Sequence, residues 1–348
     1  IGNDNSAFGV GALLSNTTGI GNTASGLSAL RANITGNYNT AHGVNALLSN
    51  TTGTQNTASG VSALGNTTTG SNNTANGFQA LLTNTVGTSN TAIGMYAMRE
   101  NNTGNDNTAT GFQALLSNTL GSKNTANGVS ALKENTTGIF NTAIGFQTLL
   151  SNTFGDQNTA IGVEALQKNT TGYRNGAFGT YSLNSNTSGF ENTAVGTAAL
   201  FFSTSGSNNT GLGHNAQVPN ASGNNQVRVG NTSVTYAGIQ VPWTITSDLR
   251  WKSNIQTSNL GLEFIKALNP VCYTRKDVEI VNRKSNILET STNPTTEYGF
   301  IAQELVPWKN SVQQIMASSA KIMKECMVFA TMIYWHLWSK PYRNNIQS

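Results

Sequence analysis

Proline is missing from the first 218 residues of this 348-residue chain, and charge is scarce in the same region. Residues 1–223 hold six basic and seven acidic side chains, so the net positive charge of the chain, +4, comes from the remainder. Without proline, each backbone position keeps an N–H that can donate to a neighbouring strand. A nearly neutral segment lacks the clustered Lys and Arg that phosphate contacts need, so we exclude nucleic acid as a partner.

Cysteine and long apolar runs are also scarce. The two cysteines, Cys272 and Cys326, form neither a disulfide framework nor a metal-ligand pattern. The three histidines are His42, His214 and His336. Their scatter predicts no metal site, and no motif predicts a cofactor. No window reaches the roughly 20 apolar residues of a membrane span, so we expect no membrane insertion. No signal peptide opens the chain, which starts in mid-pattern as a fragment would.

What the chain does have is a 17-residue repeat of the form Asn-Thr-Ala-x-Gly. Thirteen copies follow one another without a slip, with the Asn at residues 5, 22, 39, 56, 73, 90, 107, 124, 141, 158, 175, 192 and 209. We number positions from this Asn, so that position 4 is the residue four places after it. Positions 4 and 14 are Gly in all thirteen copies. A fixed period of this kind is typical of a stacked repeat architecture.

Each copy is too short for a pair of helices, which needs more than about thirty residues. We therefore predict an all-β fold, a parallel β-solenoid with one copy per coil. At a strand spacing of about 4.8 Å, thirteen coils would make a rod of roughly 60 Å. The two Gly positions suit corners, where positive φ or a close backbone approach is required.

Apolar residues recur at three positions of the coil. Position 8 is Leu or Met in twelve copies, starting at Leu13 and Leu30, which predicts a buried ladder. Position 2 is Ala in all copies but Gly211, which predicts a thin interior. Position 5 is apolar in the first ten copies, and it should face the opposite side from position 2 if the strand continues that far. An exposed apolar stripe of this length invites association, so we predict contact with sister chains there.

The repeated Asn and Thr residues have two interpretations. Stacked identical Asn side chains bond along the axis of cross-β ladders, which gives the repeat a structural role. A regular row of Thr hydroxyls is also a feature of ice-binding surfaces, and this remains the less favoured alternative.

The array over residues 5–223 resembles the head repeats of trimeric autotransporter adhesins and the shaft repeats of phage and large-virus fibres. The resemblance rests on Asn-Thr-Ala-x-Gly and the trailing Gly. It implies a solenoid and suggests a homotrimer.

A second resemblance lies downstream. Residues 246–256 read Thr-Ser-Asp-Leu-Arg-Trp-Lys-Ser-Asn-Ile-Gln, and Asn269-Pro270, Tyr273 and Gly-Phe-Ile-Ala-Gln-Glu at 299–304 follow. Together they resemble the endosialidase-type intramolecular chaperone domain of trimeric tailspikes and fibres. In that family the domain helps three chains fold in register and then cuts itself off.

The resemblance implies a cleavage site between Thr246 and Ser247. Ser247 would attack the carbonyl of Thr246, Lys252 would act as the base, and Asp248 would assist. A serine needs such a base, and lysine can serve when desolvation lowers its pKa. This would be at most a single-turnover serine–lysine peptidase. The spacing alone equally fits a helix cap at Ser247 with a solvated Lys252.

The family pattern stops after Glu304, and residues 307–348 are rich in Met, Trp and Lys. An amphipathic helix over residues 311–332 is one interpretation. The other is a shifted reading frame, because degenerate back-translation of residues 325–347 in the next frame permits a string that resembles the missing end of the chaperone domain. In that case folding assistance and cleavage would both be impaired in this chain.

The predicted order is a solenoid shaft at 1–223, a β-rich connector at 224–246, a partial chaperone domain at 247–306 and an off-pattern tail at 307–348. The favoured function is a fibre or adhesin shaft of a virion that attaches to a host surface receptor such as a glycan. A cell-surface adhesin of the same architecture is the alternative. A glycan-acting tailspike is disfavoured because the repeats hold few acids and no paired carboxylates.

Overall fold

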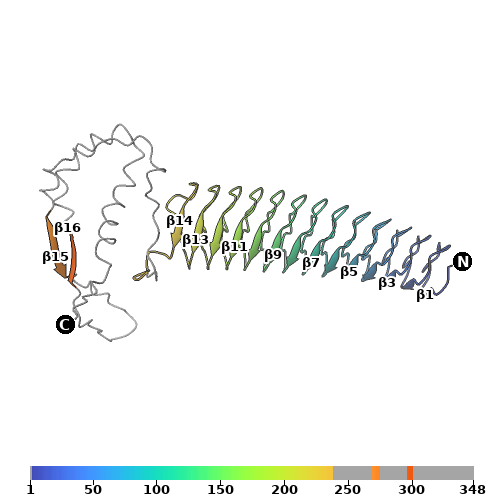
Figure 1. Ribbon diagram of the computed structural model, residues 1–348. Helices are drawn as coiled ribbons and strands as arrows, with labels where there is room; N and C mark the ends of the chain where they lie inside the picture. The colour runs from blue at the N-terminus through green and yellow to red at the C-terminus, as the bar shows by residue number, and fades with distance from the viewer. Residues whose placement is uncertain (1, 238–268, 275–295, 301–348) are drawn as a thin grey trace, which may run out of the picture. The chain divides into compact units, whose positions relative to one another are not determined.

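The computed structural model describes residues 2–237, 269–274 and 296–300, in two units that are treated separately below. The first unit is a stack of coils with one three-residue strand each, joined in chain order into a single 14-stranded parallel sheet (Figure 1). The strands are β1 Ser6–Phe8, β2 Thr23–Ser25, β3 Thr40–His42, β4 Thr57–Ser59, β5 Thr74–Asn76, β6 Thr91–Ile93, β7 Thr108–Thr110, β8 Thr125–Asn127, β9 Thr142–Ile144, β10 Thr159–Ile161, β11 Gly176–Phe178, β12 Thr193–Val195, β13 Thr210–Leu212 and β14 Val227–Val229.

The register of the sheet is the repeat of the sequence. In β9 and β10, Ala143 lies opposite Ala160, and the N–H of Thr142 donates to the carbonyl of Asn158 in the next coil at 2.8 Å. The described residues contain no helix, so the predicted β-solenoid of thirteen 17-residue coils is confirmed. The stack also takes up one strand more than the thirteen repeats provide, because β14 pairs with β13.

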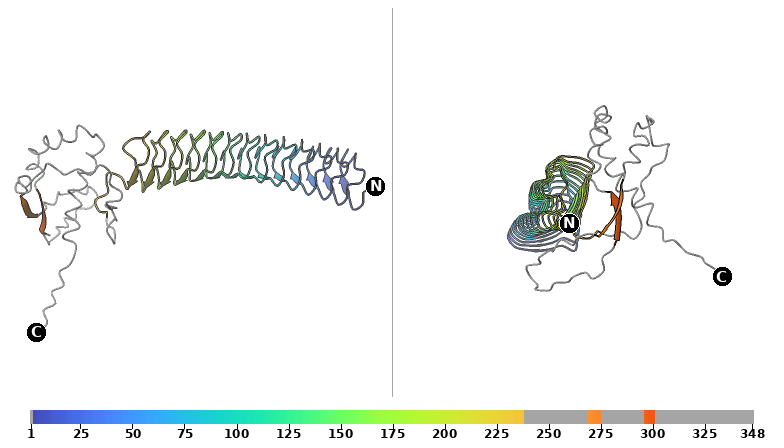
Figure 2. Two further views of the ribbon diagram at one scale, coloured as in Figure 1. Left: turned by 45° about the horizontal axis from the view of Figure 1, so that its top comes forward. Right: turned by 90° about the vertical axis from the view of Figure 1, so that its left-hand side faces the viewer.

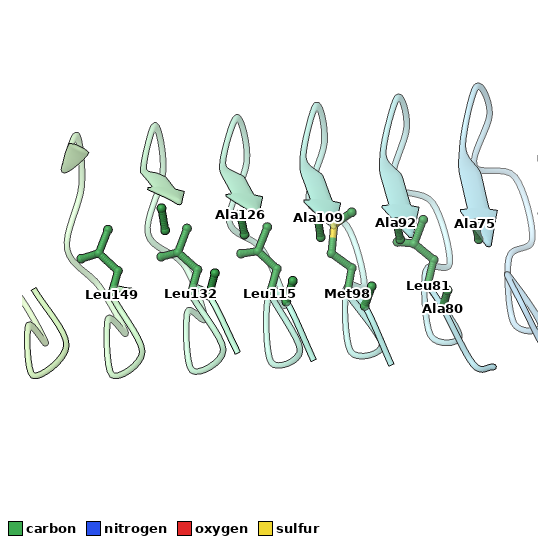
Figure 3. Packing of buried hydrophobic residues seen from close by; sticks show 14 of the residues in the cluster. Ala75, Ala80, Leu81, Ala92, Met98, Ala109, Leu115, Ala126, Leu132 and Leu149 are labelled. Atoms are coloured by element: carbon green, nitrogen blue, oxygen red, sulfur yellow. The ribbon is translucent and has the colours of Figure 1, made fainter. Parts of the chain in front are cut away.

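The interior of each coil holds one large side chain and two small ones. Position 8 supplies the large one, and from Leu30 to Leu200 these side chains are fully buried in one continuous ladder. Figure 3 shows the part of this ladder from Leu81 to Leu149. Alanines at position 2, such as Ala92, and small residues at position 7, such as Ala80, fill the rest. The predicted ladder and thin interior are therefore both present.

The backbone explains why the ladder is Leu or Met and never Val or Ile. Positions 6, 8 and 16 of the coils have left-handed φ, for example Gln113 at +56°, Leu115 at +51° and Lys123 at +61°. For a β-branched residue this conformation is a genuine outlier. No copy of the repeat has Val, Ile or Thr at any of these three positions.

The glycines at positions 4 and 14 are required for different reasons. At position 4 the φ is positive, and a Cβ on Gly111 (φ +131°) would lie 2.5 Å from the carbonyl oxygen of Gly128. At position 14 no unusual φ occurs, but a Cβ on Gly121 would lie 2.6 Å from the Gly138 oxygen and clash with Asn118. The first corner needs both the conformation and the space, and the second needs the space alone, as the sequence predicted for corners in general.

Two buried Asn ladders close the coils and join them. The Oδ1 of Asn141 accepts the backbone N–H of Asn158 in the next coil at 3.0 Å, and its Nδ2 donates to Gly155 O at 2.8 Å in its own coil. A second ladder at position 11 adds Asn152, whose Nδ2 donates to Gly155 O at 2.9 Å and to Asn135 Oδ1 at 2.8 Å. The predicted bonding of Asn along the axis is confirmed; the clip to Gly155 was not predicted.

In the right-hand view of Figure 2, which looks nearly along the stack of the first unit, successive coils lie offset from one another in projection.

In the second unit, the described residues form an antiparallel pair, β15 Pro270–Thr274 with β16 Thr296–Phe300. Pro270 lies opposite Phe300 and Val271 opposite Gly299.

Candidate self-association surface and cleavage site

The apolar residues at position 5 form an outward-facing row, which we call the fifth-position stripe. Its members in the first ten coils are Val10, Leu27, Val44, Val61, Phe78, Met95, Phe112, Val129, Phe146 and Val163. From the second coil to the tenth they are between 37% and 50% exposed in the single chain. The stripe thus lies outside the interior, as predicted.

The predicted cause of that orientation, alternation of side chains along a strand that continues as far as position 5, was wrong. Each strand of the repeats instead ends at position 3, as β9 does at Ile144, and Gly145 then turns the chain with a φ of +135°. The corner, rather than the pleat, directs position 5 to the surface.

Aromatic side chains contact one another in the middle of this stripe. Tyr96, at position 6, packs edge-on against Phe78 with ring centroids 5.4 Å apart, and its ring lies 6.3 Å from that of Phe112. The Arg99 guanidinium lies over the same Tyr96 ring at 5.4 Å. A cluster of half-exposed rings of this kind offers more apolar area than isolated surface residues do.

A second group of aromatic and charged residues lies at the corner that precedes the strand, at positions 15 and 16. Tyr173 and Phe190 stack with centroids 4.8 Å apart and planes 2° from parallel. Arg174 lies over Tyr173 and forms an exposed ion pair with Glu191, with 3.2 Å between Nη1 and Oε1. We call Tyr173, Arg174, Phe190 and Glu191 the corner cluster. Tyr, Phe and Arg are enriched at binding interfaces, whereas an exposed ion pair itself contributes little stability.

The predicted cleavage residues Thr246, Ser247, Asp248 and Lys252 lie outside the described residues, so their mutual geometry remains a prediction. The later motif segments are described in part. The β15–β16 pair places Pro270 opposite Phe300, although 29 residues lie between them in the chain.

Within the part of the chain that the structure describes, no group of three or more His, Cys, Asp or Glu side chains is arranged to hold a metal ion. Over the same residues, no helix is long and apolar enough to cross a membrane. Cys272 is exposed in β15 and is not in a disulfide.

Comparison with known proteins gives one result. Searches of curated proteins and of solved structures found no match to this chain. Residues 247–308 match the family model described as chaperone of endosialidase. The match begins at Ser247 and ends close to the point where the motif pattern stops in the sequence. It confirms that a segment of the endosialidase-chaperone type follows the β-solenoid.

Proposed function

We propose that this chain is the shaft of a homotrimeric attachment fibre, assembled with the help of its C-terminal chaperone segment. The observation that carries this proposal is the order of two features in one chain: a β-solenoid with an exposed apolar stripe, and then a segment of the endosialidase-chaperone family. Three long chains with a 17-residue repeat can pair in the wrong register by whole coils, and a chaperone at one end sets that register.

The structure of the solenoid favours the role of a rigid spacer, which holds the two ends of the fibre apart, over a catalytic role. Its coils form an uninterrupted stack with a buried ladder from Leu30 to Leu200. Each coil bonds to its neighbours through backbone and Asn hydrogen bonds. Repeat stacks of this kind gain stability from every neighbour contact, so length can be added without a new core.

The chaperone segment would then leave the fibre by cutting the bond between Thr246 and Ser247. Ser247 Oγ attacks the Thr246 carbonyl carbon while the Lys252 amine takes the hydroxyl proton. The C–N bond breaks, the proton passes to the Ser247 nitrogen, and an ester joins the two residues. Water then hydrolyses the ester, which leaves a carboxylate on Thr246 and a new N-terminus at Ser247.

Attachment to a host surface is the further part of the proposal, with a virion as its setting. The corner cluster is the part of the rod we assign to receptor contact, with a glycan as the favoured receptor. A cell-surface adhesin of the same architecture is the alternative. Mass spectrometry of purified virions and of cell envelopes separates the two, because the chain should be found in the first preparation and not in the second.

Sedimentation equilibrium of the purified chain tests the trimer. We expect three times the 36.7 kDa chain mass before cleavage, independent of concentration in the micromolar range. A well-folded monomer with the circular dichroism of a β-solenoid would contradict the proposal.

A further inference from the structure

The outward residue at position 3, at the end of each strand, changes character along the rod. In coils 2–5 this third-position column is polar, with Ser25, His42, Ser59 and Asn76. From coil 9 onward it is apolar without interruption, with Ile144, Ile161, Phe178, Val195, Leu212 and then Val229 of β14. Between coils 2 and 8 only Ile93 is apolar, and in coil 1 the residue is Phe8.

The fifth-position stripe changes in the opposite sense. It is apolar through coil 10 and then becomes polar, with Thr180, Thr197 and His214 in coils 11–13. Coils 9 and 10 are apolar at both positions, for example at Ile161 and Val163. The apolar line is thus continuous from one end of the rod to the other, but it crosses the Gly corner between the two columns.

The two columns are equivalent in exposure where each is apolar. From coil 9 to coil 13, the third-position residues are between 38% and 42% exposed, and Val163, the last apolar member of the fifth-position stripe, is 38% exposed. The change of column is therefore not a transfer of apolar side chains to the interior. It is a displacement of one surface line around the rod.

The spacing of this line fits a second copy of the chain as its cover. One apolar residue occurs per coil over all thirteen coils, and the coils are joined by hydrogen-bonded strands. A second copy of this solenoid presents its own apolar residues with the same rise per repeat, so the two rows match coil for coil. Because the apolar residues leave the fifth-position stripe after coil 10 and continue in the third-position column, a contact line that follows them does not stay in one column.

We infer that the three sister rods face their common axis with the fifth-position stripe in coils 1–10 and with the third-position column in coils 11–13, so that the rods wind about one another and cross from column to column at coils 9 and 10. This inference rests on the self-association proposed above. It adds the path of the contact, which self-association alone does not specify.

Disulfide trapping tests the path in the full chain, with Cys272 and Cys326 replaced by Ser. The contact variants are Val61→Cys in the fifth-position stripe and Val195→Cys in the third-position column. Each has a matched control in the same coil on the other column, Ser59→Cys and Thr197→Cys. After mild oxidation, we expect several-fold more cross-linked chains from each contact variant than from its control, on a non-reducing gel.

Each outcome has a distinct meaning. Strong cross-linking at both Val61→Cys and Thr197→Cys would show straight rods in contact along one column and would overturn the inference, while the proposed fibre would stand. Equal cross-linking within both pairs in a sedimenting trimer would overturn it as well. A monomer by sedimentation, with no cross-link at any site, would overturn the proposed function itself.

Discussion

Leucine at position 8 meets two requirements at once. Its side chain fills the interior, and its backbone has a φ close to +50° in the twelve coils that carry Leu or Met there. Strand-rich proteins usually favour Val and Ile, because branched side chains pack well on a pleated surface. Here the ladder residue lies in a turn rather than in a strand, so the unbranched Cβ decides the choice.

Exchange of Leu115 tests this explanation. Leu115→Ile keeps the volume of the side chain but places a branched Cβ at φ +51°, which should cost about 1–3 kcal/mol of unfolding free energy. Leu115→Met is the matched control, since Met98 occupies the same position one coil earlier, and it should cost less than about 1.5 kcal/mol. Urea unfolding followed by circular dichroism measures both. Equal loss in the two variants would show that packing alone selects leucine.

The ladder and the corners could be predicted from the sequence, whereas the left-handed turns were not. The apolar residue at position 8 predicted the ladder, and the fixed Gly predicted the corners. The left-handed turns at positions 6, 8 and 16 were signalled by the absence of Val, Ile and Thr there in every copy. An absence is harder to read than a conserved motif, because many solvent-exposed positions also lack β-branched residues by chance.

At the scale of the coil, Asn141 acts as a clip. It accepts from the next coil and donates to the far corner of its own coil, so it holds residues fourteen places apart together. Its period predicted the bond along the axis. The hydrogen bond within the coil, from Asn141 to Gly155, could not be predicted. It depends on which residues of a 17-residue coil come close together when the coil closes, and the period of the repeat does not determine that.

Asn141→Ala should therefore destabilise the rod more than a surface change of the same chemistry. The change removes the hydrogen bond that the N–H of Asn158 donates to Asn141 Oδ1 and the one that Gly155 O accepts from Asn141 Nδ2. Each buried group left unpaired costs about 1–3 kcal/mol. Asn127→Ala, at the exposed end of β8, is the control and should leave the unfolding midpoint almost unchanged. Thermal unfolding monitored by circular dichroism compares them; equal midpoints would mean that water or a neighbouring Asn replaces the clip.

At the scale of the whole molecule, the sequence predicted more of the rod than of the cleavage site. Thirteen copies average out local exceptions such as Gln217, so the period determines the fold. Ser247 and Lys252 occur once, and their five-residue separation is compatible with a catalytic pair or with a helix cap. The match over residues 247–308 names the kind of segment and does not give the distance between the two side chains.

Charge in the fifth-position stripe should prevent assembly. The triple variant Phe78→Asp, Phe112→Asp and Phe146→Asp would bury unpaired carboxylates between chains, which costs several kcal/mol per group unless they are protonated or paired. We expect monomers or aggregates in place of the trimer by sedimentation. The control carries three Asp residues at position 13, on Thr69, Thr137 and Thr171, which are exposed in the single chain. A trimer in the first variant would place the contact elsewhere on the rod.

Cleavage should depend on Ser247 and Lys252 together. In a chain with a complete chaperone segment, we expect a new N-terminus at Ser247, read by N-terminal sequencing of the small fragment. Ser247→Ala removes the nucleophile. Lys252→Arg keeps the positive charge, but a guanidinium does not lose its proton at neutral pH and so cannot act as the base. Each variant should therefore leave the chain uncut. Ser253→Ala is the control and should cut normally. The trimer should persist in both uncut variants, because assembly precedes the cut in the proposed function. The chain with its off-pattern residues 307–348 should cut itself poorly. The same chain with the alternative reading frame restored over those residues should cut itself well. Efficient cutting of the Ser247→Ala chain, or a fragment that begins at another residue, would show that Ser247 is not the nucleophile.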